Sequence, residues 1–197
     1  MITRGCKPDL GEILFDVENY VGVHKTVVGI AERAGVEDVE KVVNFENDIL
    51  KALPDPNLFQ GHDATALKED IESGDDIILV REQKKKNLMA LLIFIKPRDC
   101  VHNLALDAKL DKSAILKTAV ISVIAVHPDF RGIGIQRYLL KLAEKLAKDC
   151  GAKYLTATVS PQNPHSLQNF LDKGYEIRDE KMKYGCKNRY IMLKVLS

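Results

Sequence analysis

Residues 124–140, IAVHPDFRGIGIQRYLL, constrain the fold more than any other part of the chain, because they join an apolar strand, a glycine turn and a helix. The run that contains the strand, residues 119–126, is apolar and β-branched, which is typical of a strand covered on both faces. Beyond the turn, apolar side chains recur at helical spacing and basic side chains fill the other positions. The apolar positions are Ile135, Tyr138, Leu139, Leu142, Ala143 and Leu146. The sequence therefore predicts a buried strand that leads directly into an amphipathic helix.

The turn itself has the chemistry of an anion-binding site. The first N–H groups of a helix lack internal partners, and the helix dipole places partial positive charge at that end. Gly132 and Gly134 let the chain bend sharply and let a ligand approach the main chain, and Arg131 adds a positive charge. A strand, a glycine turn and a helix also occur in αβ units that bind no ligand, so the turn alone leaves both interpretations open.

Composition and charge narrow the class of protein. The 197 residues suit one domain, and 29 Lys and Arg against 28 Asp and Glu give no general attraction to nucleic acid or to an anionic membrane. The four cysteines lack metal-binding or disulfide-framework spacing and the five histidines show no ligand pattern, so we expect no metal. Without a signal-peptide pattern or an apolar run of membrane length, a soluble, cytoplasmic protein is expected.

The order of the expected elements indicates an α/β fold with a mixed sheet. Strands are predicted at residues 27–32, 77–80, 88–95, 119–126, 154–159 and 189–196. Helices are predicted at residues 36–53 with Asp38 as N-cap, at 64–72, from 135 onwards, and between Asn163 and Gly174; a short helix is expected around 104–110. Hairpins between the αβ units argue against a doubly wound parallel sheet.

A second motif follows the strand predicted at residues 154–159. In residues 160–177, SPQNPHSLQNFLDKGYEI, Asn163 can cap a helix with Pro164 at its first position, and Gly174 can end it. Leu167, Phe170 and Leu171 form its apolar stripe. Each of these features also has a purely structural explanation.

Together the two segments resemble the nucleotide and pantetheine site of the GNAT superfamily of acyl-CoA N-acyltransferases. The family's Arg/Gln-x-x-Gly-x-Gly/Ala turn is matched by residues 131–136. Its Asn-x-x-Ser/Ala-x-x-x-Tyr/Phe-x-x-x-Gly-Phe/Tyr helix is matched by Asn163, Ser166, Phe170, Gly174 and Tyr175. Two motifs in the expected order are more specific than either alone. The resemblance implies an acyltransferase domain over residues 26–197. Residues 1–25 are left as an N-terminal extension, in which residues 13–17 could form a strand and residues 18–24 show no clear period.

The resemblance implies a mostly antiparallel sheet flanked by helices, in which the parallel strands 119–126 and 154–159 splay apart to admit the pantetheine arm. The main chain at Ile124 and Val126 would bond the arm and the acyl carbonyl, the N–H groups of residues 132–137 would hold the pyrophosphate, and Asn163 would contact the thiol end or serve only as a helix cap. The residues implied in cofactor binding are Ile124, Ala125, Val126, Arg131, Gly132, Ile133, Gly134, Ile135, Gln136, Arg137, Asn163 and Phe170.

Two positions depart from the family pattern. Gln136 replaces the usual Gly or Ala, so its side chain is expected to project from the phosphate turn. Phe170 stands where many relatives carry a tyrosine that protonates the departing thiolate, so another group must do this. The general base is not identified: the strand offers Ser122, and Thr158 lies where some relatives place a glutamate. His127 is interpreted as a turn residue.

The implied reaction is direct attack of a primary amine of a small molecule or protein on the thioester of acetyl-CoA, within a ternary complex and without a covalent enzyme intermediate. The acceptor is expected near the first two helices and the connection 97–117, where Asp99, His102, Asp107 and Asp111 either attract a cationic amine or are merely solvated. The acceptor itself stays unidentified, and a homodimer is left open.

Two other functions compete with this one. Phe170 and the missing base favour a non-catalytic acyl-CoA-binding or regulatory module. A nicotinamide or flavin Rossmann protein is disfavoured, because Arg137 occupies the third glycine position of the dinucleotide fingerprint and because hairpins flank the αβ units.

Overall fold

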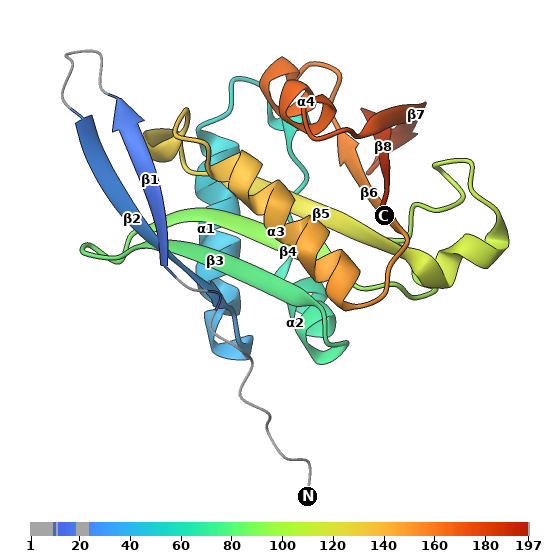
Figure 1. The fold of residues 1–197 in the computed structure, drawn as a ribbon, viewed down its shortest axis with the longest axis horizontal. Coiled ribbons are helices and arrows are strands. Elements are labelled where there is room, and N and C mark those ends of the chain that lie inside the picture. Colours follow the sequence, from blue (N-terminus) through green and yellow to red (C-terminus); the bar gives the residue numbers. More distant parts are fainter. Residues whose placement is uncertain (1–9, 11, 19–23, 197) are drawn as a thin grey trace, which may run out of the picture.

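One mixed sheet of eight strands organises the protein (Figure 1). The computed structural model describes residues 10, 12–18 and 24–196. The strands are β1 (Glu12–Glu18), β2 (His24–Arg33), β3 (Asp76–Glu82), β4 (Leu88–Ile95), β5 (Thr118–Val126), β6 (Tyr154–Val159), β7 (Glu176–Lys183) and β8 (Lys187–Val195). Their spatial order is β1-β2-β3-β4-β5-β6-β8-β7, and every neighbouring pair is antiparallel except β5 and β6. The expected mostly antiparallel sheet with one parallel pair is confirmed.

Helices cover both faces of this sheet. Helices α1 (Val39–Lys51) and α2 (Ala64–Glu72) lie behind it in Figure 1, and α3 (Ile135–Asp149) crosses in front. Helix α4 (Pro164–Leu171) lies beside the hairpin of β7 and β8 in the same view. Alternate residues of β3 enter separate cores: Ile78 joins the α3 side and Ile77 the α1 side. No helix in the described part of the chain is long and apolar enough to cross a membrane.

The parallel strands β5 and β6 pair only over their first halves. Their register runs from Thr118 opposite Tyr154 to Ile121 opposite Ala157, whereas β5 continues to Val126 and β6 to Val159. The expected splay is therefore present. A bulge accompanies it, because Ile93 and Phe94 of β4 face Val123 and Ile121, which leaves Ser122 between them without an opposite residue. Such a bulge bends its strand and redirects a side chain.

Two segments differ from the sequence predictions. The expected helix around residues 104–110 is wrong: turns occupy this stretch, and a short 3₁₀ helix follows at Lys112–Lys117. Asn103 explains the difference, since its amide donates to the carbonyls of Arg98 and Ile115, and its oxygen accepts from the N–H of Ala105. Strand β7 was not predicted, because its sequence EIRDEKMK is charged and mostly exposed and so lacks an apolar alternation.

The N-terminal part of the chain contributes the edge of the sheet. Strand β1 pairs with β2 from Glu12 opposite Ile30 to Glu18 opposite His24. The boundary expected between residues 25 and 26 thus falls inside β2.

Candidate active site

The glycine turn holds the start of α3 in a conformation that suits only glycine. Gly132 has φ of +83° and Gly134, the N-cap of α3, has φ of +86°. A Cβ on Gly132 would meet no atom within 4 Å, so the requirement comes from the backbone and not from crowding. The N–H of Tyr138 donates to the carbonyl of Gly134 at 3.0 Å, so the N–H groups of residues 135–137 precede the first helical bond.

Two guanidinium groups stand beside this turn. Arg131 folds back, and its Nε donates to the carbonyl oxygen of Val126 at 3.2 Å. Arg137 is exposed, and its Nη2 would lie 3.9 Å from a Cβ on Gly134. Their positive charges add to the partial charge at the helix N-terminus, which makes this corner of the molecule suited to an anion such as a phosphate.

Gln136 does not crowd the turn, because its side chain crosses to α4. Its Nε2 donates to Ser166 Oγ at 2.9 Å, and its Oε1 accepts from Asn169 Nδ2 at 2.8 Å. The Gln136 side chain, which replaces the usual Gly or Ala, therefore links α3 to α4. The Gln136 side chain is thus directed away from the N–H groups at the start of α3.

The splay leaves main-chain groups of β5 without a strand partner. The N–H of His127 donates to the carbonyl of Met89 in β4 at 2.9 Å. Backbone groups alternate sides along a strand, so those of Ile124 and Val126 point the other way, towards the gap left by β6, where the Val126 carbonyl accepts from Arg131. Strand groups exposed in this way suit an extended, amide-containing ligand.

Helix α4 closes the other side of the gap. Asn163 Oδ1 accepts from the N–H of Ser166 at 3.1 Å, so this residue does cap α4, with Pro164 at the first helical position. Phe170 is buried and packs edge-on against Tyr175, with 4.9 Å between ring centroids. Both Asn163 and Phe170 also line the pocket described next.

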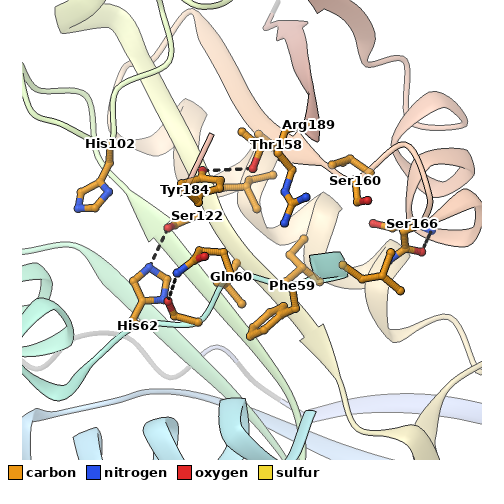
Figure 2. Close-up of a pocket in the computed structure, with 18 of the residues that line it drawn as sticks. Phe59, Gln60, His62, His102, Ser122, Thr158, Ser160, Ser166, Tyr184 and Arg189 are labelled. Carbon is orange, nitrogen blue, oxygen red and sulfur yellow. Dashed lines mark hydrogen bonds between the residues drawn. The ribbon is translucent and has the colours of Figure 1, made fainter. Parts of the chain in front are cut away.

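A pocket of about 280 Å³ lies at the inner end of the splay. Its walls come from residues 58–63 between α1 and α2, from 121–124 of β5, from 157–160 after and within β6, from α4, and from Tyr184 and Arg189 of the last hairpin (Figure 2). Of the predicted cofactor residues, Ile124, Asn163 and Phe170 line this pocket, whereas the glycine turn lies outside it. The volume is near the lower end for small-molecule sites. It suits a small acceptor and an acyl group.

A chain of hydrogen bonds, Glu46–His62–Ser122, runs through the pocket wall. Glu46 of α1 is 1% exposed, and its Oε2 accepts from the N–H of His62 at 2.7 Å while its Oε1 lies 3.2 Å from His62 Nδ1. His62 Nε2 lies 3.1 Å from Ser122 Oγ on the bulge (Figure 2). The Glu46 carboxylate favours the tautomer with the proton on Nδ1, which leaves Nε2 as an acceptor. Gly61 admits the carboxylate, since a Cβ there would lie 3.2 Å from Glu46 Oε2.

The surroundings of His62 hold its pKa above the ordinary value of 6.5. Burial alone would lower the pKa of His62, but the hydrogen bond and charge of Glu46 outweigh it, and Asp70 and Asp63 act in the same direction. Burial and the neighbouring Asp75 in turn raise the pKa of Asp70. The His62 side of the pocket is therefore rich in acidic groups.

Sequence reasoning missed Glu46 and His62, although one signal for Glu46 was present. Glu46 lies four residues after Val42 and three before Ile49, so it occupies the apolar stripe of α1, where a charge needs a partner. Its partner, His62, follows in the next connection at a distance that no local pattern specifies.

The other candidates divide between the pocket and the surface. His102 lines the pocket, whereas Asp99 and Asp111 are exposed. Asp107 pairs with Lys181 at 3.0 Å and Lys183 at 2.7 Å. His127 lies just after β5, as the N-cap of a short 3₁₀ helix at Pro128–Phe130.

Thr158, also considered from the sequence, has its hydroxyl 3.2 Å from that of Tyr184. Within the described residues, no group of three or more His, Cys, Asp or Glu side chains could hold a metal ion.

Comparison with known proteins agrees with this geometry. The sequence model of the Acetyltransferase (GNAT) family matches residues 47–175. None of the curated proteins is significantly similar to the chain in sequence. Among solved structures, YncA of Salmonella typhimurium, which contains its cofactor acetyl-CoA, superposes with a TM-score of 0.63 at 16% identity, covering 86% of this chain and 94% of that chain.

Two further structures are similar. An N-acetyltransferase of Staphylococcus aureus gives a TM-score of 0.65 at 16% identity, over 86% of this chain and 99% of that chain. A ribosomal-protein-alanine N-acetyltransferase of Brucella melitensis gives 0.63 at 16% identity, over 85% and 99%. At these identities the likeness concerns the fold alone. Because the family model spans more than half of the chain, the protein belongs to the acetyltransferase (GNAT) family.

Proposed function

We propose that the protein is an N-acetyltransferase that transfers the acetyl group of acetyl-CoA to a primary amine by direct attack in a ternary complex. The observation that carries this proposal is the splay between β5 and β6, which ends in the pocket on one side and lies next to the glycine turn on the other. The turn and the free strand groups suit a long ligand with phosphates at one end and amides along its arm.

The residues of the gap fit this co-substrate. The N–H groups at the start of α3, with Arg131 and Arg137, would hold the pyrophosphate. The main chain of Ile124 and Val126 would bond the arm, and Asn163 and Phe170 would line its thiol end. When bound, acetyl-CoA supplies an acetyl thioester whose carbonyl carbon accepts the amine while the thiolate departs.

In this proposal His62 acts as the general base. An alkylammonium has a pKa of about 10.4 and must lose a proton before it can attack. His62 and Ser122 both line the pocket, and His62 Nε2 lies 3.1 Å from Ser122 Oγ. The imidazole can therefore take this proton directly or through the Ser122 hydroxyl. Glu46 holds the ring in the required tautomer and stabilises the imidazolium that forms.

Phe170 cannot protonate the departing thiolate, so another group of the pocket would do so. A thiolate is a good leaving group, since the pKa of a thiol is about 8.5, so it needs little help near neutral pH. Tyr184 lines the pocket, and its hydroxyl, 3.2 Å from that of Thr158, can supply the proton that a tyrosine at position 170 would give.

The test is a thiol-release assay with acetyl-CoA against polyamines, amino acids, aminoglycosides and peptides with free N-termini. Amine-dependent release of coenzyme A would support the proposal, provided that mass spectrometry shows a product in which one acetyl group replaces a hydrogen of the amine. Tight binding of acetyl-CoA without turnover across the panel would support the non-catalytic acyl-CoA-binding module instead.

A further inference from the structure

Arg189 places a buried positive charge on the wall of the pocket. It belongs to β8, its residue is 3% exposed, and it lines the pocket. Figure 2 shows its side chain reaching from the strand into the pocket, on the side away from His62. Its location in the pocket is not explained by the roles proposed above for acyl transfer.

No carboxylate neutralises this charge within the described part of the chain. Arg189 Nη1 donates to the carbonyl of Asn188 at 2.8 Å and Nη2 to the carbonyl of Asn57 at 2.7 Å. The ring of Tyr184 lies 5.9 Å from the guanidinium carbon. These partners are neutral, and no ion pair within 4.0 Å joins Arg189 to a described acidic residue. A buried cation in this state is costly unless an anion completes its surroundings.

A second cation reinforces the positive field. Lys187 Nζ donates to the carbonyl of Phe59 at 2.7 Å, two residues from the Asn57 carbonyl that Arg189 holds. Burial and the charge of Arg189 lower the pKa of Lys187, and burial lowers the pKa of Arg189, with Asp55 as the acidic residue that opposes both shifts. This end of the pocket is therefore suited to an anion.

The opposite side of the pocket has the reverse polarity. Against the effect of burial, Glu46 at 3.2 Å from the His62 ring, Asp70 and Asp63 raise the pKa of His62, and Asp70 also lies 3.7 Å from Arg98. A molecule that carries an ammonium at one end and an oxyanion at the other would match both sides of the pocket.

We propose that the acceptor is an amine that also carries a carboxylate, and that Arg189 binds this carboxylate. The inference rests on the proposed acetyl transfer and names its substrate class. The guanidinium uses two of its groups on carbonyls, and the remaining N–H donors can form charge-assisted hydrogen bonds with the carboxylate oxygens. The amine then lies on the side of His62, which takes its proton. Free amino acids and the C-termini of short peptides share this chemistry.

A purely structural role for Arg189 makes a different prediction. If Arg189 only holds the connection between α1 and α2 against β8, its loss would lower kcat/KM equally for all acceptors. If it binds the carboxylate, its loss would impair only acceptors that have one.

The experiment measures kcat/KM for matched acceptors, each L-amino acid against its carboxamide, and dipeptides against dipeptide amides. The wild type is compared with Arg189→Met, Arg189→Lys and the control Arg178→Met, whose arginine lies on β7 outside the pocket. The ratio of wild type to variant for each acceptor removes the difference in basicity between the two amines. Acetyl-CoA binding, measured by calorimetry, reports whether each variant is folded.

We expect Arg189→Met to lower kcat/KM for carboxylate acceptors by about 10- to 100-fold, and for carboxamides by less than about 3-fold. Arg189→Lys retains the charge and should keep part of the activity, and Arg178→Met should match the wild type. Equal losses for both acceptor types, or a wild type without preference for carboxylates, would overturn the inference while acetyl transfer stands. Acetyl-CoA binding without release of coenzyme A to any amine would overturn the proposed function, and this inference with it.

Discussion

At the residue scale, the imidazole of His62 has two neighbours with different roles. Glu46 raises its pKa and fixes its tautomer, while Ser122 connects its free nitrogen to the pocket. As only the neutral ring accepts a proton, the acid limb of the profile of kcat/KM against pH should lie above pH 6.5.

Substitution of His62 and of Glu46 tests that arrangement. His62→Gln should lower kcat by about 100-fold or more with an unchanged dissociation constant for acetyl-CoA, whereas the pocket control His102→Gln should lose less than about 3-fold. Glu46→Gln removes the carboxylate that contributes most to raising the pKa of His62, so the acid limb should move to lower pH while kcat falls. An acid limb that stays in place in Glu46→Gln would contradict the assignment.

The glycine turn provides a second prediction at this scale. Gly134→Glu places a carboxylate where the pyrophosphate is proposed to bind, and Gly134→Ala introduces the same backbone strain, about 1–2 kcal/mol, without the charge. We expect calorimetry to show acetyl-CoA binding at least about 100-fold weaker in the Glu variant and within about 10-fold of wild type in the Ala variant. High salt should narrow the difference. Equal weakening in both variants would argue against a phosphate at the turn.

At the scale of elements, Gln136 makes the orientation of α4 depend on α3. Its side chain contacts both Ser166 and Asn169 in α4, and Asn163 at the start of that helix lines the pocket. Gln136→Ala should lower the free energy of unfolding by about 1–2 kcal/mol, because two partly buried hydrogen bonds are lost. The exposed Gln168, which bonds Asp172 within the same segment, provides the control: Gln168→Ala should cost less than about 0.5 kcal/mol. Urea denaturation measures both, and equal costs would show that this link between α3 and α4 contributes nothing.

The elements also show which features could be predicted from the sequence. Strand β5, the turn and α3 follow from local apolar spacing and from glycine, so residues 119–146 sufficed for them. The connection 97–117 and β7 could not be predicted in this way. Asn103 organises the former through carbonyls up to fifteen residues away, and β7 is a strand because β8 pairs with it. The Glu46–His62–Ser122 chain joins three elements over 76 residues, and no local pattern encodes such a contact.

At the scale of the whole molecule, the sheet separates two cores that should respond independently to substitution. Ile49 of α1 and Ile78 of β3 are buried in different cores. Each Ile→Val substitution should cost about 0.5–1.5 kcal/mol, and the double variant should equal the sum within about 0.5 kcal/mol. Thermal or chemical unfolding of the four proteins gives the coupling energy. A coupling above about 1 kcal/mol would mean that packing strain crosses the sheet.

The last hairpin has a consequence for how such a protein can change over evolution. Strand β5, the glycine turn and α4 lie within the segment that matches the family, residues 47–175, whereas Tyr184 and Arg189 come after it. The residue proposed to bind the acceptor carboxylate therefore lies outside the segment proposed to bind the co-substrate, although other walls of the pocket lie within that segment. Exchange of the β7–β8 hairpin is expected to change which acceptor is bound, while β5, the glycine turn and α4 continue to bind acetyl-CoA.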